Sequence, residues 1–339
     1  MRCLALFTGG LDSQIAVRLL LRQGIEVIGI FVQTPFTPPF AAAEVAAASL
    51  QIELRRIDWE RDYFSLLQRP HFKFAEELAP CLDCRIGMVS RARELMLSRG
   101  ASFLISGEVV GQRPSSLRSR DLETIAVHGD ADDLLLRPLS ALLLPPTLPE
   151  RNGWVDRSQF FGWHGRGRKE QLAIAREWKL VEPAGHAPGC SLLEPTYAGR
   201  LRHLLTQNES PPLWQLRTLK IARHFWRENA HLVVAKNQAE ATELKHVFAS
   251  AAATKEGNVV LLEPANFRGP VGLLVVPLEK PPVGENILQA AATVIGRFSK
   301  NVTPGVSFLN LLGWSHATTM IPPPTAVDDD VSQSASFDG

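Results

Sequence analysis

The sequence predicts an α/β protein in which a parallel-sheet domain is followed by a smaller C-terminal α/β domain. Short apolar runs alternate with segments of helical period in the first part of the chain, a pattern typical of a parallel sheet covered by helices on both faces. A length of 339 residues suits two domains. We therefore expect domains at residues 1–198 and 199–320, and the composition of 321–339 predicts a disordered tail.

The elements of the first domain follow from the period of their apolar residues. In the first predicted helix, Ile15, Leu19 and Leu20 recur on one face. Ligands of parallel sheets collect at the carboxyl ends of the strands, so the loops that follow the strands are candidate sites. The predicted strands cover 3–7, 26–32, 53–58 and 102–106, and the predicted helices cover 13–22, 41–50 and 83–98.

The loop between the first strand and the first helix has the sequence Thr8-Gly9-Gly10-Leu11-Asp12-Ser13. Glycines let the backbone approach an anion closely, and the first turn of a helix offers free N–H groups and the positive end of the helix dipole. Thr8 and Ser13 add hydroxyl groups, and Asp12 is suited to hold a Mg²⁺ ion that bridges phosphates. The loop therefore predicts a polyphosphate site.

This loop resembles the PP-loop of ATP pyrophosphatases, usually Ser-Gly-Gly-x-Asp-Ser, with Thr8 in place of the first serine. It lacks the lysine of a Walker A motif and the third glycine of a dinucleotide fingerprint. The resemblance implies that ATP is cleaved between its α and β phosphates, and that a carbonyl oxygen is adenylated before a nitrogen or sulfur nucleophile displaces AMP. A plain glycine-rich turn is the alternative.

A second candidate segment, residues 106–116, follows the fourth predicted strand and should lie at the same edge of the sheet. Glu108 and Gln112 would present a carboxylate and an amide toward the phosphates, where they could hold a metal ion, the ribose or the target base. Alternatively, these two side chains cap a helix that begins near Ser115.

The Gly-Glu-x-x-Gly-Gln sequence that begins at Gly107 is followed by Leu-Arg-Pro-Leu around Arg137. These two motifs, in this order, resemble the PP-loop domain of tRNA 4-thiouridine synthetases over roughly residues 1 to 200. The resemblance implies an ATP-dependent sulfurtransferase that acts on tRNA. It also implies that Gly107 and Arg137 belong to the nucleotide site.

Cys81 and Cys84 open the predicted helix at 83–98, and Cys190 lies far downstream. At a helix start, free N–H groups and the dipole stabilise a thiolate, and Arg85 adds positive charge, so we expect both close cysteines to be reactive or ligating. Three converging thiolates would leave a 4Fe-4S cluster with one open iron. This spacing also resembles the three-cysteine site of iron–sulfur dependent tRNA thiolation enzymes.

Two other uses of these thiols remain open. With His186 as a fourth ligand, the three cysteines could form a structural zinc site. Alternatively, Cys190 carries a persulfide that Cys81 or Cys84 resolves as a disulfide, without any metal. The fourth cysteine, Cys3, lies among apolar residues of the first strand and is expected to be a core residue.

A basic cluster precedes the helix predicted to end at Trp178. It contains Arg166, Arg168 and Lys169, which could clamp the α-phosphate of ATP or the RNA backbone. The thiouridine synthetases have a lysine in a comparable place, which makes Lys169 our candidate for a catalytic role. A solvated basic loop is an equal alternative.

The domain at 199–320 begins with a mixture of basic and aromatic residues that suits phosphate contacts and base stacking. We expect it to bind RNA, because a THUMP region, which usually precedes the PP-loop of 4-thiouridine synthetases, is absent here. The domain faintly resembles RNA-binding modules of the NFACT type, and a dimerisation domain is the alternative. Strands are predicted at 231–235, 259–263 and 271–276, helices at 239–252 and 286–298, and Trp214 and Trp226 are the candidate stacking residues.

Composition limits the remaining possibilities. The net charge is +1, so any RNA binding must rely on local basic patches. No run of eighteen apolar residues could cross a membrane, and the first strand begins too close to Met1 for a signal peptide, so the cytoplasm is expected. The sequence leaves the oligomeric state open, with a homodimer as one option.

Together these patterns predict an ATP-dependent tRNA sulfurtransferase, most simply a 4-thiouridine synthetase. No rhodanese-type sulfur carrier is recognisable, so sulfur is expected from free sulfide or from a partner such as a cysteine desulfurase. Two other classes stay open: a PP-loop enzyme that thiolates or amidates a small metabolite, and a non-catalytic RNA-binding module.

Overall fold

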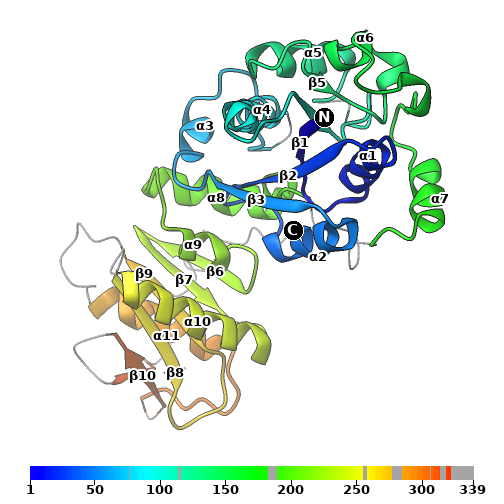
Figure 1. Cartoon of the computed structure of the whole chain (residues 1–339). Coiled ribbons are helices and arrows are strands. Elements are labelled where there is room, and N and C mark those ends of the chain that lie inside the picture. The colour runs from blue at the N-terminus through cyan, green and yellow to red at the C-terminus, as the bar shows by residue number, and fades with distance from the viewer. Residues whose placement is uncertain are drawn as a thin grey trace. The chain divides into compact units, whose positions relative to one another are not determined.

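The computed structural model describes residues 1–75, 77–113, 116–181, 189–254, 258–276, 285–305, 307–313 and 318–321. The chain splits into two compact units, Met1–Ala198 and Gly199–Gly339 (Figure 1). Apart from Ile321, the predicted disordered tail lies outside the described residues. Within the described residues, no helix combines the length and the apolar character that crossing a bilayer requires.

The first unit is built on a five-stranded, all-parallel sheet with the strand order β3-β2-β1-β4-β5. The apolar runs form the four predicted strands, so the parallel α/β fold is confirmed. β5 was not predicted, because two residues are too few to show a period. The strands are β1 (Arg2–Leu6), β2 (Glu26–Gln33), β3 (Glu53–Asp58), β4 (Phe103–Ser106) and β5 (Leu135–Leu136).

Helices connect these strands, as parallel pairing requires. Figure 1 shows α1 and α2 beside the sheet formed by β1, β2 and β3. The α-helices are α1 (Leu11–Arg22), α2 (Phe40–Leu50), α3 (Phe64–Gln68), α4 (Cys81–Ser98), α5 (Ser119–His128), α6 (Leu148–Arg151), α7 (Lys169–Glu177) and α8 (Pro195–Gln207). Three 3₁₀ turns are η1 (Ala141–Leu143), η2 (Arg157–Gln159) and η3 (Ser191–Leu193).

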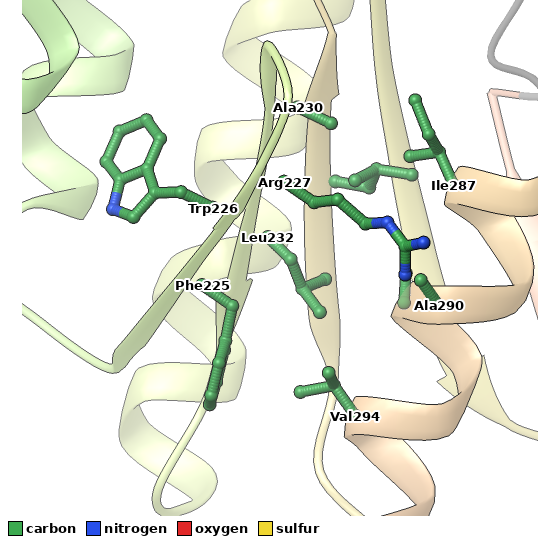
Figure 2. A pocket seen from close by; sticks show the side chains of 10 residues that line it. Phe225, Trp226, Arg227, Ala230, Leu232, Ile287, Ala290 and Val294 are labelled. Atoms are coloured by element: carbon green, nitrogen blue, oxygen red, sulfur yellow. The ribbon is translucent and has the colours of Figure 1, made fainter. Parts of the chain in front are cut away.

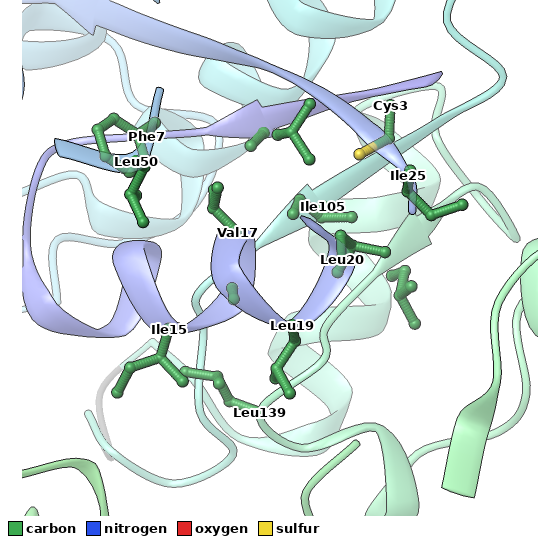
Figure 3. Close-up of a cluster of buried hydrophobic side chains, with 14 of the residues drawn as sticks. Cys3, Phe7, Ile15, Val17, Leu19, Leu20, Ile25, Leu50, Ile105 and Leu139 are labelled. Carbon is green, nitrogen blue, oxygen red and sulfur yellow. The ribbon is translucent and has the colours of Figure 1, made fainter. Parts of the chain in front are cut away.

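The apolar core of the first unit lies between α1 and the sheet (Figure 3). Ile15 and Leu20 of α1 are fully buried, and Figure 3 shows Leu20 near Ile105 of β4 while Ile15 points toward Leu139. Cys3 is also fully buried there, and burial raises the pKa of its thiol. The prediction that Cys3 is a core residue is therefore confirmed, and this core fixes the start of α1 at the edge of the sheet.

The second unit contains a six-stranded sheet with the order β11-β10-β8-β9-β7-β6, in which every pair is antiparallel. Alternate residues of its strands pack on opposite faces, one with α10 and α9 and the other with α11. The elements are α9 (Leu213–Thr218), β6 (Arg223–Arg227), β7 (Ala230–Val234), α10 (Gln238–Thr254), β8 (Asn258–Pro264), β9 (Gly272–Val276), α11 (Glu285–Arg297), β10 (Phe308–Leu312) and β11 (Thr318–Met320).

The two tryptophans expected to stack on bases are instead part of the interior of the second unit. Trp214 is 5% exposed in the core beside α10, and Trp226 is 7% exposed. The Trp226 ring stacks on His231 with 3.7 Å between ring centroids. Strand β6 alternates between its two faces, and this alternation turns Trp226 inward while Phe225 points to the other side. Neither indole is available for base stacking.

Candidate functional site

The Gly-Gly loop places the start of α1 at the carboxyl end of β1. Gly9 has a φ of 76°, and a Cβ at this position would lie 2.8 Å from the Cα of Ala43 in α2, so only glycine fits. The Ser13 hydroxyl donates a 2.7 Å hydrogen bond to the Gly10 carbonyl. No side chain caps the start of α1 at Gly10. The backbone N–H groups of the first turn can therefore receive a phosphate.

Asp12 gathers polar groups from two distant segments of the first unit. The Gln112 amide donates a 2.9 Å hydrogen bond to Asp12 Oδ2, and Arg168 lies 3.6 Å from the same oxygen. Asp12 Oδ1 is buried and has no hydrogen-bond partner among the described residues. Burial raises the pKa of Asp12, although Gln112 and Arg168 act in the opposite direction. A buried carboxylate oxygen without a donor fits a divalent cation, which would supply the missing positive charge.

Gly107 brings the second motif against the first. A Cβ on Gly107 would lie 2.6 Å from the backbone carbon of Asp12 and 2.6 Å from the backbone nitrogen of Ser13. Such a distance leaves no room for any side chain, so the backbone after β4 touches the backbone of the phosphate loop. The phosphate loop and the Gly-Glu-x-x-Gly-Gln motif are therefore in direct contact.

Glu108, the next residue, is paired with two arginines. Its Oε1 accepts a 2.6 Å bond from Arg85, and its Oε2 accepts bonds from Arg137 at 2.9 Å and from the Ser106 hydroxyl at 3.0 Å. Burial alone would raise the pKa of Glu108, but Arg137 and Arg85 outweigh it and lower the pKa to about 2. Both carboxylate oxygens are occupied. This geometry does not support the expectation that Glu108 and Arg137 contact the nucleotide directly.

The three cysteines of the predicted sulfur site converge on Tyr63. Cys81 and Cys84 lie in the first turn of α4, and Cys190 immediately precedes η3. Tyr63 donates a hydrogen bond to the Cys84 sulfur and interacts electrostatically with all three thiols. The Cys84 thiol also interacts with Cys190 and Cys81. The chain therefore gathers thiols from two segments that are remote in sequence.

The position of Cys84 at the helix start does not lower the pKa of its thiol, and the expectation that Cys81 and Cys84 are reactive or ligating stays a prediction. Burial raises the pKa of its thiol to about 12, and the smaller, opposite effects of Tyr63 and Arg85 do not compensate. Removal from water disfavours the charged form more strongly than one hydrogen bond and one nearby guanidinium favour it. A nearby positive charge or a bound metal would lower the pKa of this thiol.

An aromatic cluster borders these thiols through Tyr63 and Tyr197. The ring of Phe36 lies 5.4 Å from that of Tyr63 and 6.2 Å from that of Tyr197, measured between centroids. Trp59 packs edge-on against Tyr63 at 5.0 Å. Burial raises the pKa of Tyr197, and the neighbouring Cys190 raises it further. The three cysteines themselves keep intermediate exposure, so the aromatic side chains border the thiol site without sealing it from solvent.

The spacing of the thiols bears on which group they could hold. Among the described residues, no set of three or more His, Cys, Asp or Glu side chains is close enough to hold a single metal ion. His186, the fourth ligand of the zinc alternative, lies outside the described residues. The described residues therefore do not form a site for a single metal ion, and a 4Fe-4S cluster on the three cysteines stays a prediction.

The basic cluster before α7 is positioned by a short bridge. Val110, in the second motif, pairs with His164, and the Gly165 amide donates a 2.8 Å bond to the Val110 carbonyl. This pairing brings Arg168 to Asp12, whereas Lys169 is exposed at the first residue of α7. The structure thus places the arginine beside the loop, and a catalytic role for Lys169 stays a prediction.

Two contributors were not identified from the sequence. Gln14 in α1 is fully buried, and its amide donates 2.8 Å hydrogen bonds to the carbonyls of Gly9 and Val181. A polar residue on the apolar face of a helix was a signal that could have revealed it. Tyr63 had no such signal, because nothing in its local sequence indicates a thiol neighbour.

A separate pocket lies in the second unit between β6, β7 and α11. Figure 2 shows Arg227 extending across it toward Ala290, while Phe225 lies on the same side of the strand. The floor is apolar and includes Leu232, Leu274 and Val294. The pocket does not involve the phosphate loop or the thiols, so it is not part of the candidate site for chemistry.

Comparisons with known proteins find a family match within the first unit. Residues 1–142 match the family described as Thiamine biosynthesis protein (ThiI). A probable tRNA sulfurtransferase of Methanothermobacter thermautotrophicus is 29% identical over 133 residues, which cover 36% of this chain and 33% of that protein. The tRNA-specific 2-thiouridylase MnmA of Pelobacter propionicus is 33% identical over 122 residues, 32% of this chain and 33% of that protein.

The chain thus spans about a third of the length of these curated relatives. A solved 4-thiouridine synthetase–RNA complex with bound ATP is 18% identical, with a TM-score of 0.37, and the match covers 63% of this chain and 52% of that one. The family match includes the phosphate loop, the two close cysteines and the second motif. Residues 1–142 are therefore similar to the ThiI family, and the relatives that match this part of the chain include a probable tRNA sulfurtransferase.

Proposed function

We propose that the protein is an ATP-dependent tRNA sulfurtransferase that replaces a uridine carbonyl oxygen with sulfur, giving 4-thiouridine. The observation that carries this proposal is the contact between two sites in one unit. The nucleotide loop touches Gly107, and the next residue, Glu108, is bonded to Arg85, which follows Cys84 in α4. An adenylating loop and a set of three thiols are what such a reaction needs.

In the first step, the N–H groups at the start of α1, with Thr8 and Ser13, would hold the phosphates of ATP. Asp12, through its unpartnered Oδ1, would hold Mg²⁺, which supplies charge neutralisation for the leaving pyrophosphate. Arg168, which lies 3.6 Å from Asp12 Oδ2, would steady the same phosphates. The uridine oxygen attacks the α-phosphorus, the bond to the β-phosphate oxygen breaks, and pyrophosphate leaves.

In the second step, a sulfur nucleophile adds to the activated uridine carbon. If the nucleophile is hydrosulfide, the carbon–oxygen bond breaks, AMP leaves with the oxygen, and one proton is released. No oxidant or reductant is required. Water competes with sulfur for the same carbon, and the aromatic side chains of Phe36, Tyr63 and Tyr197 beside the thiols would reduce its access.

The sulfur would reach this carbon in one of two ways, and we favour a 4Fe-4S cluster held by Cys81, Cys84 and Cys190. Such a cluster supplies an open iron for hydrosulfide. The metal-free alternative uses a Cys190 persulfide that attacks the uridine. A second cysteine then attacks the Cys190 sulfur, thiouridine is released, and an external dithiol must reduce the disulfide. Broad visible absorbance of anaerobically purified protein would indicate the cluster, and its absence would favour the persulfide. The proposed sulfur donor is free sulfide or a cysteine desulfurase.

The second unit is proposed to hold the tRNA. Strand β6 carries Arg223, Phe225 and Arg227 on one face, and Arg223 lies 4.6 Å from the ring centroid of Phe298. Phe298 is 42% exposed and its ring lies 5.8 Å from that of Phe225. Guanidinium groups beside accessible rings suit phosphates and unstacked bases. We propose these β6 side chains and Phe298 as the RNA contacts, instead of the buried Trp214 and Trp226.

The proposal is tested by incubating anaerobically purified protein with tRNA, Mg-ATP and sulfide, followed by mass spectrometry of the nucleosides. We expect thiouridine and AMP in equal amounts. Asp12→Asn should form neither product, and Cys84→Ala should form AMP and pyrophosphate without thiouridine. AMP formation that does not depend on tRNA would favour a small-metabolite enzyme, and no AMP under any condition would favour a non-catalytic RNA-binding protein.

A further inference from the structure

The ion pairs of Glu108 connect the two halves of the proposed site. One carboxylate oxygen of Glu108 forms an ion pair with Arg85 of α4, and the other forms an ion pair with Arg137. The side chains of Glu108 and Arg137 are 10% and 6% exposed, so water competes little for the charged groups of this ion pair. A charge that is buried and doubly paired holds its partners in fixed positions.

On the nucleotide side, the position of this carboxylate is fixed by more than its charges. Gly107 is pressed against the Asp12 backbone, and the Ser106 hydroxyl donates to Glu108 Oε2 at 3.0 Å. Arg137 also donates a 2.9 Å hydrogen bond to the Leu122 carbonyl, which anchors it independently. The loop at Gly107 therefore keeps its place even when the charge of residue 108 is removed.

On the sulfur side, the ion pair is made by a side chain of the first turn of α4. The start of α4 carries Cys81 and Cys84, and Arg85 reaches Glu108 from that turn with a side chain that is 25% exposed. A second fixed point of the turn is Asp83, which accepts backbone hydrogen bonds from His71 and Phe72. These residues tie the turn to its own preceding loop, whereas the Arg85 side chain of this turn forms an ion pair with Glu108 in the strand-end loop.

We propose that Glu108 is a positioning residue that holds the thiol-bearing turn of α4 in register with the nucleotide loop. This inference rests on the proposed sulfurtransferase function and specifies how its two half-reactions are coupled. Adenylation needs the loop alone, whereas sulfur delivery also needs the thiols at a fixed distance from the adenylated base. Loss of the Glu108 charge leaves Arg85 without its anion and lets the turn shift, so adenylated uridine is hydrolysed to uridine and AMP before sulfur arrives.

The test compares AMP formation and thiouridine formation in the same reaction for Glu108→Gln, which keeps the size of the side chain and removes its charge. We expect the KM for ATP and the rate of AMP formation to stay within about three-fold of wild type. The yield of thiouridine per AMP should fall by about ten-fold or more, because small misplacements of a reacting group are costly. Arg85→Met should give the same split.

A matched control is available in the same unit. Glu150 has a 2% exposed side chain paired with Arg157, and this pair is not in contact with either half of the site. Glu150→Gln therefore removes an equally buried charge and should lower thermal stability without changing the yield of thiouridine per AMP. Unfolding curves of both variants show whether stability alone accounts for a change in yield.

The possible outcomes separate the inference from its premise. An unchanged yield per AMP in Glu108→Gln, or an equal fall in Glu150→Gln, overturns the positioning role while the sulfurtransferase function stands. A wild-type protein that forms no thiouridine overturns the proposed function and this inference with it. A selective fall in Glu108→Gln and Arg85→Met supports both.

Discussion

The side-chain amide of Gln112 donates a 2.9 Å hydrogen bond to Asp12 Oδ2, although 100 positions of the chain separate the two residues. The bond fills one carboxylate oxygen and leaves Oδ1 turned inward with no donor among the described residues. Gln112 therefore orients the carboxylate. One oxygen accepts this hydrogen bond, and the other is the oxygen proposed above to hold Mg²⁺.

Replacement of Gln112 by Leu should weaken the binding of Mg-ATP. A hydrogen bond to a charged group contributes about 1.5–3 kcal/mol, and its loss leaves Asp12 free to rotate, so we expect the KM for Mg-ATP to rise by about ten-fold or more. The measurement is pyrophosphate release at varied ATP and saturating Mg²⁺. Folding should change little, because Gln112 is only half-buried.

A similar amide–carboxylate pair on the surface provides the control for Gln112. Gln159 donates a 3.0 Å hydrogen bond to Asp156 Oδ2 in an exposed turn. Gln159→Leu removes the same kind of bond and should leave the KM for ATP unchanged. An equal effect of both substitutions would show that Gln112 does not act through Asp12.

Gly107→Ala should abolish ATP binding. The added methyl group would lie 2.6 Å from backbone atoms of Asp12 and Ser13, and backbone cannot yield as a flexible side chain does. The phosphate loop must then move from its position at the start of α1. Equilibrium binding of ATP measures the effect, and Gly167→Ala, whose Cβ would meet no atom within 4 Å, should bind normally.

The elements and the local motifs of the first unit could be predicted from the sequence, because each depends on residues that are close together in the chain. The Gly-Gly loop and the period of α1 are of this kind. The partners of Glu108 could not be predicted, because Arg85 and Arg137 come from segments that only the folded sheet brings together. An acidic residue in a motif looks the same in sequence whether it binds metal or arginine.

Burial is the property that the sequence interpretation assessed least well. The helix position of Cys84 and the nearby Arg85 favour a charged thiol, but the sequence does not show how far the sulfur is removed from water. Trp226 was expected on the surface because basic residues surround it. In an edge strand the neighbours face the other way, so adjacent charges do not indicate exposure.

Acid should destabilise the second unit through His231. Its ring is fully buried, its Nε2 lies 2.8 Å from His224 Nδ1, and Gln215 faces its other nitrogen. Burial lowers its pKa well below the usual value, and His224, His203 and Arg200 lower it further. The unfolded chain therefore binds a proton near pH 6.5 that the folded unit rejects, so stability is full above that pH and falls below it by about 1.4 kcal/mol per pH unit.

The check on His231 is chemical unfolding, followed by tryptophan fluorescence, at pH 7.5 and pH 5. His231→Gln should be less stable at pH 7.5 but should lose the part of the pH dependence that this ring supplies. His246→Gln, at an exposed position in α10, should keep the full pH dependence. If the pH dependence of His231→Gln equals that of wild type, another group is responsible.

Arg223 and Arg227, on one face of β6, allow a test of whether the second unit binds RNA. Replacing Arg223 and Arg227 together by Gln should weaken tRNA binding and reduce the dependence of log K on log salt by about one for each lost phosphate contact. Lys245, on α10 against the opposite face of the sheet, pairs with Glu263, and Lys245→Gln should leave both quantities unchanged. Filter binding at several salt concentrations measures them. Equal salt slopes for wild type and the double variant would show that β6 does not contact the RNA. A guanidinium that contacts no phosphate releases no counterion when the complex forms.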